Sequence, residues 1–376
     1  MIMTEWKTYK LGDIAKFQTG KLNSNAAVEN GKYPFFTCSP NTLAIDNYAF
    51  DKEAILLAGN NAEGNFSIKY YKGKFNAYQR TYIIETYNDI CDIKFLFYAL
   101  KLCLQQFKLM SQGTSTKFLT AVILNNFEIS LPGLEEQRRI AGILGAIDDK
   151  IENNRCINTN LELQAQALYK QWFVDNRSDD WEEKQLSEIA LHITDGVHNT
   201  VIDSPEGEYY LLSCKNIKSG QLLIGSNERR IDRETFAKLR KRTRLSQGDI
   251  LVTSVGTVGE MYLVNEFPTN YEFQRSVAII KPNQDIISSY FLYAALLYQR
   301  NELKHLAHGA VQQCIFISDL KEYSFIVPNK NDISAFDEVV APMFNKIGEL
   351  QKENEALSTL RDTLLPKLMN GEIKTE

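Results

Sequence analysis

Two long stretches of the chain place apolar residues at intervals that alternate strictly between four and three positions. This spacing is typical of the seam of a coiled coil. The first series is Ile140, Leu144, Ile147, Ile151, Asn154, Asn158, Leu161, Ala165, Leu168 and Trp172. The second, 196 positions later, is Phe336, Val340, Met343, Ile347, Leu350, Asn354, Leu357, Arg361, Leu364 and Leu368. We predict two long helices that pack on each other; the alternative is that each packs only on its own domain.

The asparagines within the two series predict how the helices pair. An antiparallel arrangement that places Ile140 opposite Leu368 also places Asn154 opposite Asn354. Two facing amides in an apolar seam can satisfy each other's hydrogen bonds and fix the register. We therefore predict antiparallel helices with this pair at the seam.

Short β-like runs precede each helical stretch, and Gly and Asn residues separate them. In the first half they cover residues 54–58, 66–71, 81–86 and 126–131, with a helical stretch at 93–110. In the second half they cover 249–254, 261–264, 276–281 and 323–327, with a helical stretch at 288–307. Each globular part is therefore expected to mix α and β structure.

The two halves also share residues at a nearly constant offset. Trp6, Leu11, Ile14 and Ala15 recur 175 positions later, and Gln79-Arg80 recurs as Gln274-Arg275, 195 positions later. From Phe95 onward the offset is 196. We predict two copies of one module, with an insertion of about 20 residues between Ala190 and Ile250 in the second copy. The expected boundaries are 1–134 and 177–330 for the modules, and 135–176 and 331–376 for the helices.

The overall fold class expected is thus α+β, with two repeated mixed α/β domains separated by two long helices that pack as an antiparallel coiled coil. The net charge of −5 excludes a wholly basic nucleic-acid coat protein but allows a local basic face. The six cysteines form no CxxC pair, no apolar run is long enough to span a membrane, and no signal peptide is visible. We expect a cytoplasmic protein without a membrane contact.

Basic and polar clusters indicate where DNA could bind. Residues 229–244 hold eight cations against two carboxylates, which suits contact with phosphates; the alternative is a solvated helix face. In the first copy, lysines alternate with aromatic residues over 69–78, which suits backbone contact or else a protected edge strand. The polar loops 113–117 and 309–313 both open with Gly and then diverge, so we favour them for contacts near the bases. The candidates are Lys69, Lys72, Lys74, Tyr78, Gln79, Arg80, Thr114, Ser115, Lys117, Arg229, Arg230, Lys238, Arg240, Lys241, Arg242, Arg244, Gln274, Arg275, Gln312 and Gln313.

Within these candidates, repetition separates the expected roles. If the two copies read different DNA sequences, the shared Gln79-Arg80 and Gln274-Arg275 pairs are expected to position the backbone rather than to discriminate bases. Gln312 and Gln313 could pair with adenine in the major groove.

No catalytic or metal site is expected. None of the nine prolines follows Asn or Asp, so the Asn/Asp-Pro-Pro-aromatic loop of an amino-methyltransferase is missing. Neither G-x-G-x-x-G nor G-x-x-x-x-G-K-[ST] occurs. His305 and His308 lie three apart without a carboxylate or Cys at ligand spacing, so a solvated or DNA-facing helix end is favoured over metal binding.

Several motifs resemble the specificity subunit of a type I restriction-modification system. They are LTAVILNNFEISLP at 119–132, LEEQRRIAGILGAIDDKIEN at 134–153, WFVD at 172–175, LLPKLMNGEI at 364–373 and the W-x4-L-x2-I-A opening of each half. The resemblance covers essentially the whole chain, but where the first copy reads LEEQRRIA the second reads KNDISAFD at 330–337. This departure puts one partner contact in doubt.

The resemblance implies two target recognition domains, each reading one half of a split double-stranded DNA site, and helices that act as a ruler. It implies two adenine methyltransferase subunits and motor-nuclease subunits as partners. S-adenosylmethionine, ATP and Mg²⁺ would then bind in those partners and not in this chain. The competing interpretations are a coiled-coil protein scaffold without sequence-specific DNA binding and an enzyme such as a nuclease.

Overall fold

The structure is a computed structural model that describes residues 6–87, 89–225, 227–309 and 313–375. By contacts between Cα atoms the chain divides into two compact units. The first is Met1–Glu152 with Glu355–Glu376, and the second is Asn153–Asn354. Each unit contains one copy of the module and part of each long helix, and each is described separately.

The first unit is built on a six-stranded sheet of order β2-β8-β5-β7-β3-β4. The strands are β2 (Ala15–Thr19), β3 (Tyr33–Phe36), β4 (Leu43–Ile45), β5 (Phe50–Ala58), β7 (Ile68–Ala77) and β8 (Thr81–Thr86). Alternating side chains feed two cores. Ile55 and Ile84 pack with helix α2 (Ile93–Leu102) on one face, and Leu56 and Phe75 pack together on the other.

Smaller elements complete the first unit. Strand β1 (Lys7–Lys10) pairs with β10 (Glu128–Leu131), and β6 (Asn60–Asn61) pairs with β9 (Lys117–Phe118). The short helices are α1 (Leu11–Ile14), η1 (Ser24–Ala26), α3 (Leu104–Met110) and α4 (Ala121–Asn126). Helix α2 begins at Asp92, whose carboxylate accepts a 2.9 Å bond from the Phe95 N–H.

The second unit has two larger sheets, of order β12-β20-β17-β18 and β16-β13-β19, and two strand pairs, β11-β21 and β14-β15. Its strands are β11 (Glu182–Gln185), β12 (Ala190–Asp195), β13 (Tyr209–Leu212), β14 (Ile217–Lys218), β15 (Gln221–Leu222), β16 (Arg230–Ile231), β17 (Ile250–Thr253), β18 (Met261–Leu263), β19 (Tyr271–Phe273), β20 (Val277–Pro282) and β21 (Ser324–Val327). Its short helices are α6 (Leu186–Ile189), η3 (Cys214–Asn216), α7 (Arg233–Thr243), α8 (Ser289–Tyr298), α9 (Arg300–His305) and α10 (Ile317–Glu322).

The second copy contains two elements that have no counterpart between β3 and β5 of the first. One is the β14–β15 hairpin and the other is helix α7. Both lie between Ala190 and Ile250, the interval in which the sequence predicts an insertion. The extra residues therefore form two separate additions to one shared framework.

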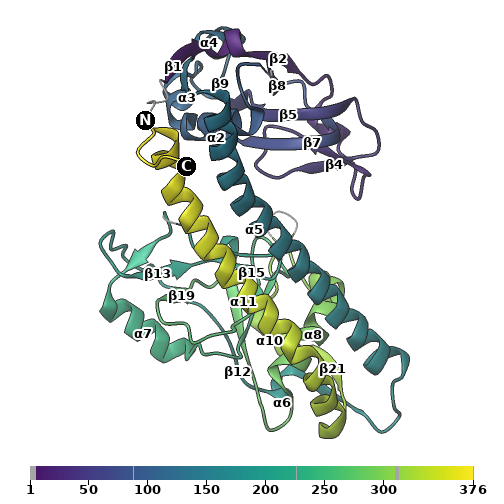
Figure 1. The fold of residues 1–376 in the computed structure, drawn as a ribbon. Coiled ribbons are helices and arrows are strands. Elements are labelled where there is room, and N and C mark those ends of the chain that lie inside the picture. The colour runs from purple at the N-terminus through teal and green to yellow at the C-terminus, as the bar shows by residue number, and fades with distance from the viewer. Residues whose placement is uncertain (1–5, 88, 226, 310–312, 376) are drawn as a thin grey trace. The chain divides into compact units, whose positions relative to one another are not determined.

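The two long helices α5 (Leu134–Tyr169) and α11 (Lys330–Met369) pack on each other (Figure 1). In the first unit Ile140 near the start of α5 shares a core with Leu368 near the end of α11. In the second unit Tyr169 at the end of α5 shares a core with Phe336 near the start of α11. The helices are therefore antiparallel, and the predicted fold class is confirmed. A π-helical segment, Lys170–Asp175, follows α5.

The predicted asparagine pair is present at the seam of the second unit. The Asn154 Nδ2 donates to Asn354 Oδ1 at 2.9 Å and to Glu353 Oε2 at 2.8 Å. Asn154 is fully buried. The amide pairing thus ties the register of α5 to that of α11, as the spacing of the two series predicts.

The LEEQRRIA stretch at the start of α5 stabilises the first module by hydrogen bonds to its backbone. Gln137 is buried and donates to the carbonyls of Ile90 and Pro132 at 3.1 and 2.9 Å, while its Oε1 accepts from the Asp92 N–H at 2.9 Å. At the matching position of the second copy stands the buried Ile333. There, Ser288 Oγ donates to Asp337 Oδ1 at 2.8 Å. The motif difference between the copies therefore reflects, in part, two ways of attaching the long helix to its module.

Candidate nucleic-acid interface

Four backbone hydrogen bonds hold a tight turn at residues 78–80 of the first unit. The N–H groups of Tyr78 and Gln79 donate to Phe36 and Leu22, each at 2.9 Å. The Thr81 N–H closes the turn on the Tyr78 carbonyl at 2.9 Å, and the Gly59 N–H binds the Arg80 carbonyl at 2.8 Å. The side chains of Gln79 and Arg80 are exposed. The turn is thus a fixed backbone that presents exposed side chains.

The second unit builds the same turn at residues 274–276. The N–H groups of Gln274 and Arg275 donate to Leu212 and Val197 at 2.8 and 3.0 Å. The Val277 N–H donates to the Gln274 carbonyl at 3.2 Å, and the Ser254 N–H to the Ser276 carbonyl at 2.9 Å. The same backbone pattern is thus present in both modules.

A glycine packs against each turn. At Gly20 an added Cβ would lie 1.9 Å from the Ala77 carbonyl oxygen, and at Gly196 it would lie 2.0 Å from that of Phe273. Both contacts are far below any that a side chain tolerates. Only glycine lets the chain approach the turn this closely.

This shared hydrogen bonding corrects the sequence alignment of the turns by one residue. Gln79-Arg80 was expected to match Gln274-Arg275, but Gln79 occupies the position of Arg275 and Tyr78 that of Gln274. Glycines Gly64 and Gly259 still match at the predicted offset, so the copies differ by one residue between these glycines and the turns. The premise that both turns present the same side chains is therefore wrong, because the equivalent exposed residues are glutamine and arginine.

Backbone hydrogen bonds join the residues that flank each glycine-led loop. Gln112 and Phe118 exchange two backbone hydrogen bonds of 3.0 and 2.8 Å around the first loop, and His308 and Cys314 exchange bonds of 2.8 and 2.9 Å around the second. Gly113 and Gly309 have φ angles of 105° and 98°. The conformation is one that glycine adopts readily, which explains why both loops open with it.

Two further contacts join loop to turn in the first unit. The Leu119 N–H donates to the Gly59 carbonyl at 2.9 Å, and the Arg80 guanidinium lies 5.3 Å from the centre of the Phe118 ring. Thr114 and Ser115 are exposed, and Lys117 is half-buried. In the second loop Gln313 is exposed, whereas Gln312 lies outside the described residues.

One lysine near each loop was missed by the sequence analysis. An added Cβ at Gly64 would lie 3.0 Å from Lys108 Cγ, and one at Gly259 would lie 2.8 Å from Lys304 Cγ. Lys108 also donates to Asn65 Oδ1 at 2.8 Å. Each lysine precedes its loop glycine by five residues, so the constant offset of the repeat could have revealed the pair.

The three lysines of β7 do not form one basic stripe. Lys69 donates to the Ser39 carbonyl at 2.9 Å, and burial lowers its pKa. Lys72 pairs with Glu53 at 3.2 Å, and Lys74 lies 4.7 Å from the centre of the Tyr48 ring. Strand alternation places Lys69 on the face opposite to the other two. Lys72 and Lys74 are both exposed, and the exposed fraction of the Lys72 side chain is 73%.

Half of the cations in residues 229–244 hold the fold of the second unit. Arg229 pairs with Asp203, and Arg230 lies 5.2 Å from the centre of the Tyr210 ring. Arg240 pairs with Glu272, a carboxylate with no exposure, and Arg242 donates to the Gly196 carbonyl at 2.8 Å. These four arginines therefore contact other groups of the second unit, and phosphate contact by the segment stays a prediction. Lys238, Lys241 and Arg244 remain exposed on α7 and its C-terminal cap.

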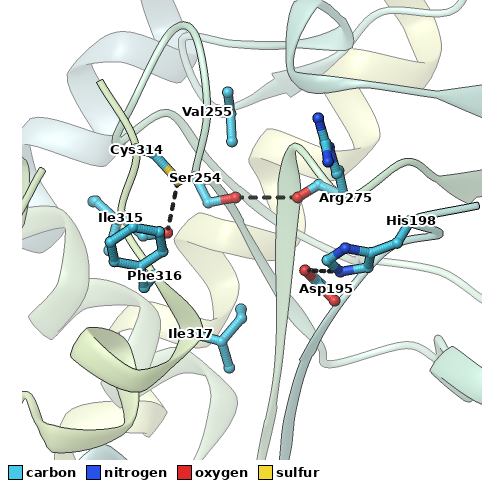
Figure 2. A pocket seen from close by; sticks show the side chains of 9 residues that line it. All are labelled: Asp195, His198, Ser254, Val255, Arg275, Cys314, Ile315, Phe316 and Ile317. Atoms are coloured by element: carbon cyan, nitrogen blue, oxygen red, sulfur yellow. Dashed lines mark hydrogen bonds and ion pairs between the residues drawn. The ribbon is translucent and has the colours of Figure 1, made fainter. Parts of the chain in front are cut away.

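A pocket of about 310 Å³ lies beside the 274–276 turn (Figure 2). Its lining comes from the end of β12 and the residues after it, from the residues after β17, from the turn and from the segment after the second glycine loop: Asp195, His198, Ser254, Val255, Arg275, Cys314, Ile315, Phe316 and Ile317. Asp195 accepts from Arg242 at 3.1 Å and contacts His198 Nε2 at 2.5 Å. One wall of the pocket is therefore apolar, and its carboxylate is held between two basic groups.

His308 was considered as part of a metal pair with His305. Its Nε2 lies 3.2 Å from Asp319 Oδ2, and its ring stacks on Phe316 with centroids 5.2 Å apart. Among the residues that the structure describes, no three His, Cys, Asp or Glu side chains are grouped so that they could hold a metal ion. No helix in this described part is long and apolar enough to cross a membrane.

Comparison with known proteins places the chain in a family. The family model described as the type I restriction modification DNA specificity domain matches residues 3–163 and 178–357, one match in each half. Over 151 residues, 40% of the chain, it is 40% identical to the EcoDI specificity subunit of Escherichia coli, and the match spans 33% of that relative's length. The MjaIX specificity subunit of Methanocaldococcus jannaschii is 26% identical over 100% of the chain and 95% of its own length.

A solved structure agrees at the level of fold. The crystal structure of the type I restriction-modification S subunit from M. genitalium has a TM-score of 0.58 at 18% sequence identity. The alignment covers 97% of this chain and 96% of that one. Two matches to one domain model, together with the duplicated turn and the paired long helices, lead to one conclusion. The chain belongs to the family of type I restriction-modification DNA specificity subunits.

Proposed function

We propose that this subunit reads a split, asymmetric DNA site, one half-site with each module, and holds two adenine methyltransferase subunits beside the bound DNA. The single observation that carries this proposal is the duplicated turn. Both modules fix the same backbone with the same hydrogen bonds, yet present different exposed side chains at equivalent positions. A repeated framework with divergent side chains is what two readers of different sequences require.

The DNA-facing surface would comprise the turn and glycine loop of each module, with α7 adding phosphate contacts in the second. Lys238, Lys241 and Arg244 are exposed cations suited to phosphate. Thr114, Ser115 and Gln313 are exposed polar side chains suited to base edges or sugars. Arg229 and Arg240, which pair with carboxylates, would serve the fold.

The proposed domain boundaries are 1–134 and 177–330 for the recognition modules, and 135–176 and 331–376 for the helices. The helices would then set the spacer between the half-sites. Support for this role comes from the asparagine pair, since a seam with a specified register gives the helix pair a defined length.

Catalysis is assigned to the partners. In this proposal the methyltransferase subunits bind S-adenosylmethionine, and motor-nuclease subunits bind ATP and Mg²⁺. The assembled complex would act on chromosomal DNA in the cytoplasm.

Competition binding by the complex of this chain with its methyltransferase tests the proposal. Labelled duplexes that contain or lack the DNA motif that this complex methylates are compared at several salt concentrations. We expect tight binding to the motif and weaker, steeply salt-dependent binding to other DNA. Weak, salt-insensitive binding without sequence preference would favour the alternative, a coiled-coil scaffold for protein partners. Cleavage by the purified chain alone would favour a nuclease.

A further inference from the structure

The corrected register of the two turns gives Gln79 and Arg275 the same structural position. Each sits at the centre of its turn, and each donates its backbone N–H to a residue just beyond the glycine that packs on that turn, Leu22 in one module and Val197 in the other. Both side chains are exposed. The two modules therefore differ in chemistry at a point where their backbones coincide.

Both positions are rigid enough to read a base. The Arg275 carbonyl accepts from Ser254 Oγ at 3.4 Å, and the next residue, Ser276, accepts from the N–H groups of Ser254 and Cys214 at 2.9 and 3.0 Å. In the first module Gln79 Nε2 donates to Asn23 Oδ1 at 2.9 Å, which orients the amide and leaves Oε1 and one N–H for a ligand. A backbone held in both modules, and in the first an oriented amide, are what a specific contact needs.

The surroundings of Arg275 fit a base edge better than a phosphate. The pocket beside it presents the apolar side chains of Val255, Ile315 and Phe316, which suit contact with a base (Figure 2). The neighbouring Arg242 guanidinium is already paired with Asp195 at 3.1 Å and so adds no unpaired positive charge that would attract a phosphate. The exposed Lys238, Lys241 and Arg244 do not line this pocket and so suit the phosphate backbone of DNA better. The surroundings of Arg275 therefore differ from those of the cations that we propose contact phosphates.

We propose that Gln79 and Arg275 are the matched base-reading residues of the two modules, with Gln79 reading adenine and Arg275 reading guanine. This inference rests on the proposed function. An arginine fork donates two hydrogen bonds to O6 and N7 of guanine, whereas a glutamine amide accepts from N6 and donates to N7 of adenine. A single position of the shared framework thereby specifies a different purine in each half-site.

The test exchanges the two side chains in the complete methyltransferase complex. Duplexes carrying every single-base change in the motif are methylated by the wild-type, Arg275→Gln and Gln79→Arg complexes, and initial rates are compared. For Arg275→Gln we expect one guanine of the second half-site to give way to adenine, with a swing in relative rate of about 5- to 150-fold. The first half-site serves as internal control and stays unchanged. Gln79→Arg should produce the reverse change in the first half-site only.

A matched variant distinguishes base reading from phosphate binding. Lys241→Gln also removes one exposed cation from the second unit, and it should slow methylation of all duplexes alike. If Arg275→Gln behaves in the same uniform way, or leaves all rates unchanged, the assignment is overturned. A wild-type complex that methylates no defined motif would contradict the proposed function, and this inference with it. Thermal melting of each complex checks that the exposed substitutions leave the fold intact.

Discussion

Neighbouring cations on α7 have different tasks. Arg240 lies against the buried Glu272, which also accepts from Thr243 Oγ1 at 3.1 and 3.0 Å, whereas Lys241 one residue later is exposed. Burial raises the pKa of Glu272, and Arg240 opposes that rise. The same kind of charge thus pairs with a buried carboxylate at one position and is exposed at the next, where we propose that it contacts DNA.

Substituting Arg240 and Lys241 distinguishes the structural role of the first from the DNA contact proposed for the second. Arg240→Ala leaves a buried carboxylate without its partner, so we expect a loss of about 3–5 kcal/mol in the free energy of unfolding. Lys241→Ala should change stability by less than about 0.5 kcal/mol. It should weaken DNA binding for all sequences and reduce the slope of log K against log salt by about 1. Denaturant titration and binding at several salt concentrations measure both effects; equal stability of the two variants would contradict the assignment.

We expect Glu162 on α5 to make the free energy of unfolding of the second unit depend on pH. Burial raises its pKa to about 7, the nearby Glu260 adds to the rise, and Arg300 opposes it. The carboxyl is therefore harder to ionise in the folded chain than in the unfolded one. Its contribution to stability is full below pH 4.5, the ordinary value, and is lost as the pH rises through about 7.

Replacing Glu162 removes this dependence. Glu162→Gln should unfold at nearly the same temperature at pH 5 and pH 8, apart from changes due to other groups. Between pH 5 and pH 8 the free energy of unfolding of the wild-type chain should fall by up to about 3 kcal/mol more than that of Glu162→Gln. Glu135→Gln, at an exposed position of the same helix, is the control and should follow the wild type. If the wild type and Glu162→Gln lose equal stability between the two pH values, the buried carboxyl is not responsible.

The long helices show which element-level features a sequence can predict. A seam of alternating four and three positions predicts the antiparallel pairing and the Asn154–Asn354 contact, because both follow from helix geometry alone. Other seam positions needed the structure. Arg361 avoids an apolar environment by donating to Asp148 Oδ1 at 2.8 Å, and Asp148 also accepts from the Tyr98 hydroxyl at 2.7 Å. Spacing does not predict that a residue of α2 completes this network.

The asparagine pair should stabilise the helix pairing as a unit. Asn154→Leu removes the donor from Asn354 and Glu353 inside the seam, so we expect a loss of about 1–3 kcal/mol. The double variant Asn154→Leu with Asn354→Leu should recover most of that loss, since two apolar residues then face each other. Denaturant titration of the three proteins measures the difference. A single variant as stable as the wild type would show that the pair does not contribute.

At the scale of the whole molecule, the repeat was visible in sequence but its residue-level register was not. Identical Gln-Arg pairs in both copies favour an alignment that is one residue out, and only backbone hydrogen bonds reveal the shift. The roles of Arg229, Arg240 and Arg242 were also hidden, because their partners Asp203, Glu272 and Asp195 lie 26 to 47 residues away along the chain. Local charge density therefore identifies a basic segment, but tertiary partners decide which cations stay available.

The two helices proposed as a ruler can be shortened without changing the register in which they pair. Removing residues 147–153 from α5 and the facing 355–361 from α11 deletes one heptad from each and keeps Asn154 opposite Asn354. The pair shortens by roughly 10 Å, about three base pairs of DNA. We expect a motif with unchanged half-sites and a shorter spacer, or no methylation. Full methylation of a motif with the original spacer would show that the helices do not set it.

The central claim, that one chain gives a methyltransferase a split target, is tested most directly by a genome-wide map of methylated adenine. Cells that express the methyltransferase subunit are compared with and without this gene. We predict that one motif with two separated half-sites appears only when the gene is present. An identical map in both strains, with the methyltransferase subunit still retained by this chain in a pull-down, would contradict the account and leave the chain a protein scaffold.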